Sequence, residues 1–353
     1  MSKKTVGKTR YSASVFLAGV VLAGLFFAGC STAADPVIPP GGASSSPSVS
    51  EEAPGAPGKS DVESKNTGEK EETAADQAPV KGSRDNSVRC LVPSADGTLV
   101  AESDTYSIDY SHTDDGYVCV KYNGPIDVIK LRITGPDEVV YTYDLKTKDY
   151  EVFPLTGGNG SYTVAIYENI EGTQYALAAS EVIDVSISDE LTPYLYPNQY
   201  VNFTKDSKAV KLASELVYSA NDDLDAVSLV YNYIIDNITY DTPKAESRPT
   251  NYVPDIDEIL DAKTGICLDY ASLMCSMLRS QGIPTRLEIG YAADAYHAWI
   301  SVYIDGVGWV NGVVEFTGNT WTLMDPTFGA STGDSTLKKF IGDGSNYTLQ
   351  KIY

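Results

Sequence analysis

The chain has little of what a metal site or a nucleic-acid surface needs. Its 353 residues include 2 histidines and 5 cysteines, and no two cysteines form a Cys-x-x-Cys pair. Zinc sites are usually built from such pairs and from clustered histidines, so we predict no metal and no cofactor. The 26 Lys and Arg residues are outnumbered by 48 Asp and Glu residues, which gives a net charge of −22. Because an acidic chain is repelled by phosphate backbones, we predict no nucleic-acid partner.

Long hydrophobic runs are also scarce, and the run at residues 15–28 is too short to span a bilayer as a helix. It ends at Gly29-Cys30 and follows four basic residues, Lys3, Lys4, Lys8 and Arg10. This arrangement resembles the lipobox signal of bacterial lipoproteins, in which cleavage precedes a lipid-bearing cysteine. We therefore expect residues 1–29 to be a signal peptide and Cys30 to anchor an extracellular body to the bacterial cell membrane. An ordinary secretory signal with an incidental cysteine is the alternative.

Composition divides the rest of the chain into three parts. Residues 30–86 are rich in Pro, Gly, Ser, Ala and Glu and poor in aromatics, which predicts a disordered stalk. Residues 87–188 contain short alternating segments separated by turn signals, which predicts a β-sandwich of immunoglobulin-like type. Residues 189–353 begin with helical spacing and end with strand patterns. The predicted fold class is α+β, with an all-β module before a mixed domain.

In the mixed domain, the hydrophobic spacing predicts both helices and strands. We expect helices near residues 209–217, 224–234, 255–261 and 267–280, and strands near residues 286–290, 298–304, 308–316 and 320–324. The aromatic segment 194–197 follows the domain boundary at once, and no glycine hinge precedes it. We therefore expect its tyrosines to pack against the mixed domain in an interface shared with the β-module.

Four cysteines remain after Cys30. Cys90 and Cys119 both lie in the β-patterned part of an exported chain, which leaves a disulfide and two separate thiols as open alternatives. Cys275 falls two helical turns after Cys267 within an apolar run, so we expect it in the core. Cys267 is left as the thiol with a chemical setting.

Cys267, His297 and Asp325 follow one another along the chain as a thiol, an imidazole and a carboxylate. In nucleophilic acyl transfer, the thiolate attacks, the imidazole takes the thiol proton, and the carboxylate fixes the imidazole tautomer. Cys267 is placed at a predicted helix start, where the helix dipole favours a thiolate and free N–H groups can bind an oxyanion. His297 opens one predicted strand and Asp325 closes a later one. Each residue alone has a structural explanation, but the three together predict an active site, with His112 as the only other candidate base.

Short motifs around these residues resemble the transglutaminase-like superfamily. They are residues 257–260 (DEIL), 263–271 (KTGICLDYA), 282–286 (GIPTR), 290–291 (GY), 297–299 (HAW) and 325–327 (DPT). The resemblance implies a papain-like fold for the mixed domain and a catalytic triad of Cys267, His297 and Asp325. It also makes Tyr240 a candidate second oxyanion donor, although a core tyrosine at a helix end is the alternative. Candidate pocket residues, with helix capping or core packing as their alternatives, are Asp269, Tyr270 and Trp299.

Two classes of function are consistent with the sequence. The first is a cell-surface thiol enzyme in which Cys267 attacks an amide of a protein or peptide, including one associated with the cell wall. If water resolves the thioester the enzyme is a peptidase or deamidase, and if a lysine amine does so it is a cross-linking transglutaminase. The second is a catalytically idle binding or scaffold lipoprotein that keeps the same fold.

Overall fold

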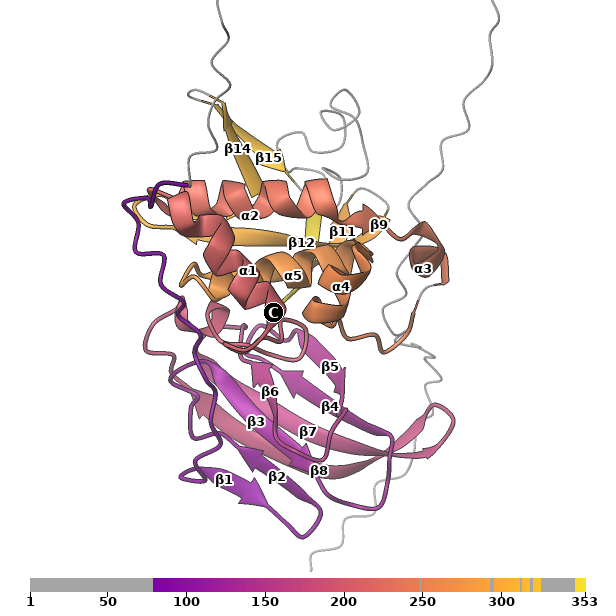
Figure 1. The fold of residues 1–353 in the computed structure, drawn as a ribbon. Coiled ribbons are helices and arrows are strands. Elements are labelled where there is room, and N and C mark those ends of the chain that lie inside the picture. Colours follow the sequence, from indigo (N-terminus) through magenta and orange to yellow (C-terminus); the bar gives the residue numbers. More distant parts are fainter. Residues whose placement is uncertain (1–78, 248, 293–294, 312, 318–319, 325–346) are drawn as a thin grey trace, which may run out of the picture. The chain divides into compact units, whose positions relative to one another are not determined.

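The computed structural model describes residues 79–247, 249–292, 295–311, 313–317, 320–324 and 347–353 (Figure 1). The predicted signal peptide, Cys30 and most of the predicted stalk lie outside these residues, as does Asp325. The membrane anchor and the stalk therefore stay predictions. In the part of the chain that is described, no helix is both long and apolar enough to cross a membrane.

Residues 100–185 form two four-stranded antiparallel sheets, in the strand orders β1-β2-β3-β6 and β5-β4-β7-β8. The strands are β1 (Val100–Glu102), β2 (Tyr106–Asp109), β3 (Tyr117–Tyr122), β4 (Ile129–Thr134), β5 (Val140–Asp144), β6 (Glu151–Pro154), β7 (Gly160–Glu171) and β8 (Gln174–Val185). Burial alternates along β4, as expected for a strand with one face on a core. Residues from both sheets, such as Val118 and Leu131, belong to the same apolar cluster. The module is all-β, and its assignment to the immunoglobulin-like type stays a prediction.

The C-terminal domain begins with helices, two of which start at aspartate side-chain caps. The helices are η1 (Thr192–Tyr194), α1 (Lys208–Leu216), η2 (Val217–Ser219), α2 (Asp223–Asn237), α3 (Thr242–Ser247), α4 (Ile256–Ala262) and α5 (Cys267–Arg279). The Asp222 side chain accepts the Asp225 N–H at the start of α2, and Asp255 accepts the N–H groups of Asp257 and Glu258 at the start of α4. Such caps satisfy the first N–H groups of a helix, which have no intrahelical partner.

The helices are followed by strands in a four-stranded antiparallel sheet of order β13-β12-β11-β16. The elements are β9 (Thr239–Tyr240), β10 (Thr264–Gly265), β11 (Thr285–Ala292), β12 (Ala295–Ile304), β13 (Gly308–Asn311), β14 (Val313–Thr317), β15 (Thr320–Met324) and β16 (Tyr347–Ile352). Two short pairs stand apart from this sheet, the parallel pair β9–β10 and the hairpin β14–β15. The segment predicted as one strand at residues 308–316 is therefore divided between β13 and β14.

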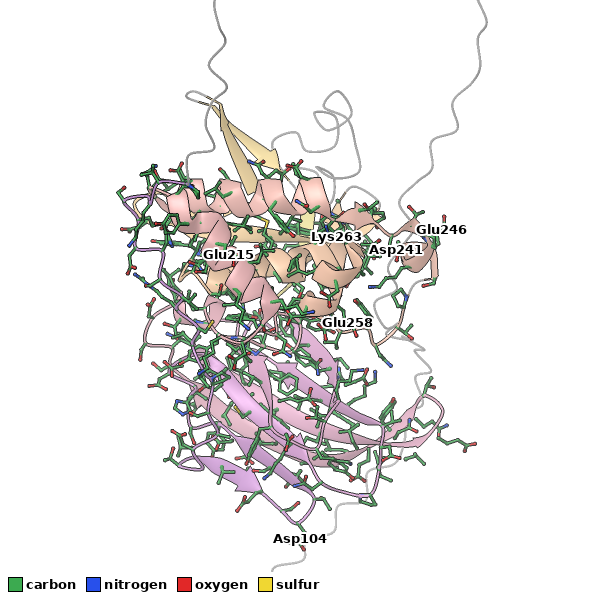
Figure 2. The ribbon with its side chains drawn as sticks, viewed as in Figure 1. Asp104, Glu215, Asp241, Glu246, Glu258 and Lys263 are labelled. Carbon is green, nitrogen blue, oxygen red and sulfur yellow. The ribbon has the colours of Figure 1, made fainter. Side chains whose placement is uncertain are left out.

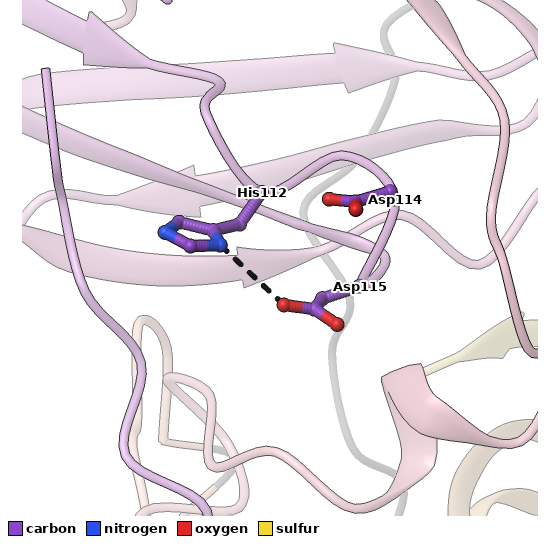
Figure 3. A group of neighbouring side chains, drawn as sticks. All are labelled: His112, Asp114 and Asp115. Carbon is purple, nitrogen blue, oxygen red and sulfur yellow. Dashed lines mark ion pairs between the residues drawn. The ribbon is translucent and has the colours of Figure 1, made fainter. Parts of the chain in front are cut away.

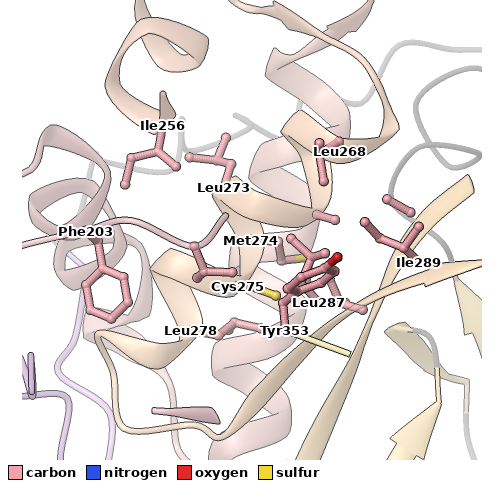
Figure 4. Close-up of a cluster of buried hydrophobic side chains, with 14 of the residues drawn as sticks. Phe203, Ile256, Leu268, Leu273, Met274, Cys275, Leu278, Leu287, Ile289 and Tyr353 are labelled. Carbon is pink, nitrogen blue, oxygen red and sulfur yellow. The ribbon is translucent and has the colours of Figure 1, made fainter. Parts of the chain in front are cut away.

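Helix α5 is the buried centre of this domain (Figure 4). All its residues are buried, and it packs against α1, α2 and α4 as well as against β11 and β12. Its apolar side chains Leu273, Met274 and Leu278 are fully enclosed. A helix that is covered on every side is held in position by tertiary packing. The first residue of α5, Cys267, is thereby fixed relative to the sheet.

The aromatic segment at 194–197 contacts the C-terminal domain, as the sequence predicts. The Tyr194 ring lies 5.1 Å from the Trp309 ring, and the Tyr196 carbonyl accepts a hydrogen bond of 2.7 Å from Arg279. The β-module also contacts the last strand, since the Thr156 hydroxyl donates to the Ile352 carbonyl at 2.9 Å. The predicted domain boundaries themselves stay predictions.

Candidate active site

Cys267 is the first residue of α5 and is 2% exposed. A tight turn brings the chain into this position. β10 pairs with β9 so that Gly265 lies opposite Tyr240, and the Asp241 N–H donates to the Gly265 carbonyl at 2.9 Å. Figure 2 labels Asp241 and Lys263, which flank the two short strands. The turn presents the thiol at the positive end of a helix, where the first N–H groups of the helix can stabilise an anion.

Gly265 is required by close packing within this turn. A Cβ atom at this position would lie 2.6 Å from the Cβ atom of Asp269 and 3.1 Å from its Oδ2 atom. Asp269 follows on the first turn of α5, and its Oδ2 atom accepts the Ile266 N–H at 2.8 Å. The carboxylate therefore holds the residue immediately before the cysteine. This is the capping role that the sequence left open for Asp269.

His297 lies on β12 directly opposite Gly290 on β11, and it is 6% exposed. Its ring is stacked with that of Trp299, with centroids 6.4 Å apart and an interplanar angle of 20°. Gly290 leaves the room that this arrangement needs, because a Cβ atom there would meet the Thr348 carbonyl oxygen at 2.0 Å and the Trp299 ring at 2.9 Å. Trp299 is therefore packed beside the histidine.

The start of α5 and the histidine strand lie close together. Helix α5 packs on β12, and the residue before His297, Tyr296, is near enough to Cys267 to interact with it electrostatically. Burial is the main cause of the raised pKa of Tyr296, with smaller contributions from nearby tyrosines and from Cys267. Asp325 lies outside the described residues, so the structure locates two of the three predicted triad members.

The remaining predicted residues have clear structural contacts. The Tyr270 hydroxyl donates to the Ile238 carbonyl at 2.7 Å, and burial raises the pKa of Tyr270. Tyr270 therefore packs in the core, which is the alternative to a pocket role that the sequence left open. Tyr240 lies on β9, with its ring 6.4 Å from that of Tyr270. Its role as an oxyanion donor stays a prediction.

A network around Asp269 was not foreseen from the sequence. The Tyr252 hydroxyl donates to Asp269 Oδ1 at 2.6 Å, and Lys244 Nζ donates to Oδ2 at 2.7 Å. Nothing in the spacing of Lys244 and Tyr252 marks them, because they reach Asp269 through α3 and the loop that follows it. Only Asp269 itself lies within a motif.

The other described cysteines are free thiols, so the structure does not contain the Cys90–Cys119 disulfide that was one alternative. Cys119 Sγ instead donates to the Ser94 carbonyl at 3.4 Å. Burial raises the pKa of both Cys119 and Cys275 to about 12, and it also raises the pKa of Cys90. Since the thiolate is the reactive form, these thiols are poor nucleophiles at neutral pH.

His112, the other candidate base, lies in the β-module beside Asp114 and Asp115 (Figure 3). One ligand atom from each of the three residues lies within 4.8 Å of the others, a spacing that could hold a metal ion. The histidine already has partners, because Nδ1 is 3.4 Å from Asp115 and Nε2 is 2.9 Å from Asp96. These contacts within a partly exposed acidic turn account for the arrangement.

Comparison with known proteins relates part of the C-terminal domain to one protein family. Residues 210–312 match the transglutaminase-like superfamily. Kyphoscoliosis peptidase of Mus musculus is 28% identical over 142 residues, which cover 37% of this chain and 19% of that protein. The uncharacterized protein YebA of Bacillus subtilis (strain 168) is 27% identical over 173 residues, which cover 43% of this chain and 22% of that protein. The chain thus spans about a fifth of the length of these relatives.

A solved structure of a candidate cysteine protease from Cytophaga hutchinsonii matches with a TM-score of 0.35 and 14% identity, covering 72% of this chain and 74% of that one. The family match shows that the chain contains a transglutaminase-like domain of mixed α and β content. The predicted papain-like fold of this domain is confirmed at the level of a superfamily match. The matched range includes Cys267 and His297 and ends before Asp325.

Proposed function

We propose that the protein is an exported, lipid-anchored thiol enzyme that acts on amide bonds of proteins or peptides outside the cell. The observation that supports this best is the placement of Cys267 at the start of a buried helix packed on the strand of His297, within a transglutaminase-like domain. Cys267, His297 and Asp325 are the proposed triad. Export and anchoring through Cys30 rest on the sequence signal.

The reaction begins when His297 takes the thiol proton and Cys267 Sγ bonds to the amide carbonyl carbon. The oxygen of the resulting tetrahedral intermediate carries the negative charge, which N–H groups at the start of α5 are placed to stabilise. The C–N bond then breaks, and the leaving amine or ammonia takes the proton from His297. The product is a thioester on Cys267.

A second nucleophile resolves the thioester. His297 takes a proton from water or from an amine, the nucleophile bonds to the carbonyl carbon, and the C–S bond breaks to restore the thiol. Water makes the enzyme a peptidase or a deamidase, whereas a lysine amine makes it a cross-linking enzyme. Asp325 is proposed to hold the imidazole in the tautomer that accepts the thiol proton.

A catalytically idle binding lipoprotein is the second candidate. It is favoured by one observation, the burial of both Cys267 and His297, which are 2% and 6% exposed. A working site needs a path for substrate to reach the thiol. A measurement of enzymatic activity distinguishes the two candidates, because only the thiol enzyme would turn over an amide substrate.

The test measures amide hydrolysis and amine incorporation in Cys267→Ala and His297→Ala. Removing a triad member costs at least ~10³-fold in acyl-transfer enzymes, and we expect that loss in both variants. Cys90→Ala removes a thiol remote from the site and is the matched control. Activity near the wild-type level in Cys267→Ala would show that the enzyme assignment is wrong.

The anchor is tested separately. Metabolic labelling with a palmitate analogue should mark the wild type, and Cys30→Ser should lose the label and be released or retained as a precursor. Equal labelling of both forms would contradict the anchor without affecting the catalytic proposal.

A further inference from the structure

Asp269 places a carboxylate in the interior two residues after the proposed nucleophile. The residue is fully buried, at 0% exposure. A carboxylate on the first turn of a helix is usually favoured by the helix dipole and faces water. A buried carboxylate is costly unless it is paired and hydrogen-bonded. Asp269 therefore needs compensation beyond that of an ordinary helix cap.

The compensation comes from a segment that is distant in sequence. Lys244 Nζ is 2.7 Å from Asp269 Oδ2, and the Tyr252 hydroxyl is 2.6 Å from Oδ1. Lys244 also donates to the Tyr252 hydroxyl at 2.8 Å and lies over the Tyr252 ring, 4.1 Å from its centroid. The three side chains thus form a closed triangle of hydrogen bonds. Through it, α3 and the loop after α3 are fastened to the start of α5.

The triangle is connected to the nucleophile by one backbone bond. Asp269 Oδ2, the oxygen that Lys244 contacts, also accepts the Ile266 N–H at 2.8 Å. Ile266 is the residue before Cys267 and is fully buried. Any movement of the carboxylate therefore changes the backbone that aims the thiol.

The triangle also sets the net charge of the buried cluster whose carboxylate lies on the residue two positions after Cys267. A thiolate is disfavoured by a neighbouring negative charge and favoured by a neighbouring positive one. With Lys244 present, the carboxylate and the ammonium cancel each other. Without Lys244, the buried carboxylate on the first turn of α5 would lose its ionic partner, and its negative charge would disfavour a thiolate on the same turn. Tyr252 does not supply a charge, because burial and the adjacent Asp269 raise its pKa and keep it a hydroxyl donor.

We propose that Lys244 and Asp269 are positioning residues for Cys267, with Lys244 neutralising the buried carboxylate so that the thiolate can form. This rests on the proposed function, since it assigns how that same nucleophile is activated. Neither residue is proposed to touch the substrate. Tyr252 completes the triangle and fixes the orientation of the carboxylate.

The experiment follows the rate of iodoacetamide alkylation of Cys267 against pH, read by peptide mass spectrometry on the full chain. The variants are Lys244→Met, Lys244→Arg and Tyr252→Phe. Lys208→Met is the matched control, because it removes a lysine that pairs with Asp261 in the same domain but on the exposed surface. Melting temperature is recorded for each variant.

In Lys244→Met, we expect the pH midpoint of Cys267 alkylation to rise by about 1 pH unit, with the rate at neutral pH falling about tenfold. Lys244→Arg should restore most of the rate, since the positive charge returns. Tyr252→Phe should move the midpoint in the same direction by less. Lys208→Met should leave it unchanged. A purely structural role for Lys244 would lower the melting temperature without moving the midpoint.

The proposal is overturned if the midpoint in Lys244→Met and Tyr252→Phe equals that of the wild type, or if Lys208→Met shifts it as much. Tyr252→Phe keeps the test decisive if Lys244→Met does not fold. If Cys267 of the wild type is not alkylated at all, the proposed function fails first. A reactive wild-type thiol with an unmoved midpoint in the variants rejects only the role of Lys244 and Asp269.

Discussion

Arg279 is the residue whose replacement should destabilise the C-terminal domain most clearly. It is the last residue of α5, is 0% exposed, and its guanidinium donates to three backbone carbonyls. Nε bonds Thr285 at 2.8 Å, Nη1 bonds Tyr196 at 2.7 Å and Nη2 bonds Tyr353 at 2.7 Å. One side chain thus joins helix α5, the segment between the two domains and the last residue of the chain, Tyr353. Arg279→Met keeps the apolar stem and removes these bonds.

The expected loss follows from two opposing effects. Hydrogen bonds to a charged group contribute about 1.5–3 kcal/mol each, so three of them contribute roughly 4–9 kcal/mol. Burial lowers the pKa of Arg279 from 12.5 to about 10, and at about 1.4 kcal/mol per pKa unit this burial costs roughly 3 kcal/mol, a cost that methionine avoids. The free energy of unfolding should therefore fall by about 3 kcal/mol, within roughly 1–6 kcal/mol.

Urea unfolding of the full chain at pH 7, followed by circular dichroism, measures this loss. Arg279→Lys should lose less, because one ammonium keeps the charge and part of the bonding. Arg132→Met removes an exposed arginine of β4 and should stay within about 0.5 kcal/mol of the wild type. If Arg279→Met were as stable as Arg132→Met, the three-carbonyl anchor would not hold the domain together.

Two further predictions concern the site and its sheet. Asp325→Asn should reduce amide turnover less than Cys267→Ala does, because it disturbs the imidazole tautomer and leaves the nucleophile in place; an equal loss in steady-state kinetics would contradict this. Glu288 is 5% exposed, and burial raises the pKa of its carboxyl. Hydrogen bonds with Ser301 and Trp299 lower this pKa, but by less than burial raises it. Because a raised carboxyl pKa favours the folded state only while the group is protonated, that stability is lost as pH rises through the folded pKa. Glu288→Gln should therefore be more stable than the wild type at pH 7, and this gain should vanish near pH ~4. Urea unfolding midpoints of both proteins at the two pH values measure the gain. A gain that is larger near pH ~4 than at pH 7 would contradict the prediction.

Much of the C-terminal domain could be predicted because its local signals agree with its packing. The helix at 255–261 is found at Ile256–Ala262, one residue later, since Asp255 serves as its cap. The strand expected at 298–304 is present but begins earlier, at Ala295. Hydrophobic spacing identifies such elements because their buried faces repeat with the period of the structure.

Other elements depend on distant partners and gave no local signal. β16 (Tyr347–Ile352) is a strand because it pairs with β11, and α3 (Thr242–Ser247) is a short helix in a polar segment. The triangle of Lys244, Tyr252 and Asp269 is equally invisible to spacing, since its members approach only after α3 folds back on α5. Contacts of this kind arise from the three-dimensional arrangement, and only Asp269 could be nominated in advance.

The central claim is that Cys267 is a thiol activated by His297, and selective alkylation tests it most directly. Wild type and His297→Ala are treated with iodoacetamide at pH 7, and the labelled cysteines are identified by peptide mass. Among the four cysteines that the structure describes, the account predicts fast labelling of the wild type at Cys267 alone, because burial raises the pKa of Cys90, Cys119 and Cys275. In His297→Ala, labelling of Cys267 should slow at least ~10-fold, since the imidazole that takes the thiol proton is gone. Equal rates in the two proteins, or labelling no faster at Cys267 than at Cys275, would contradict the account.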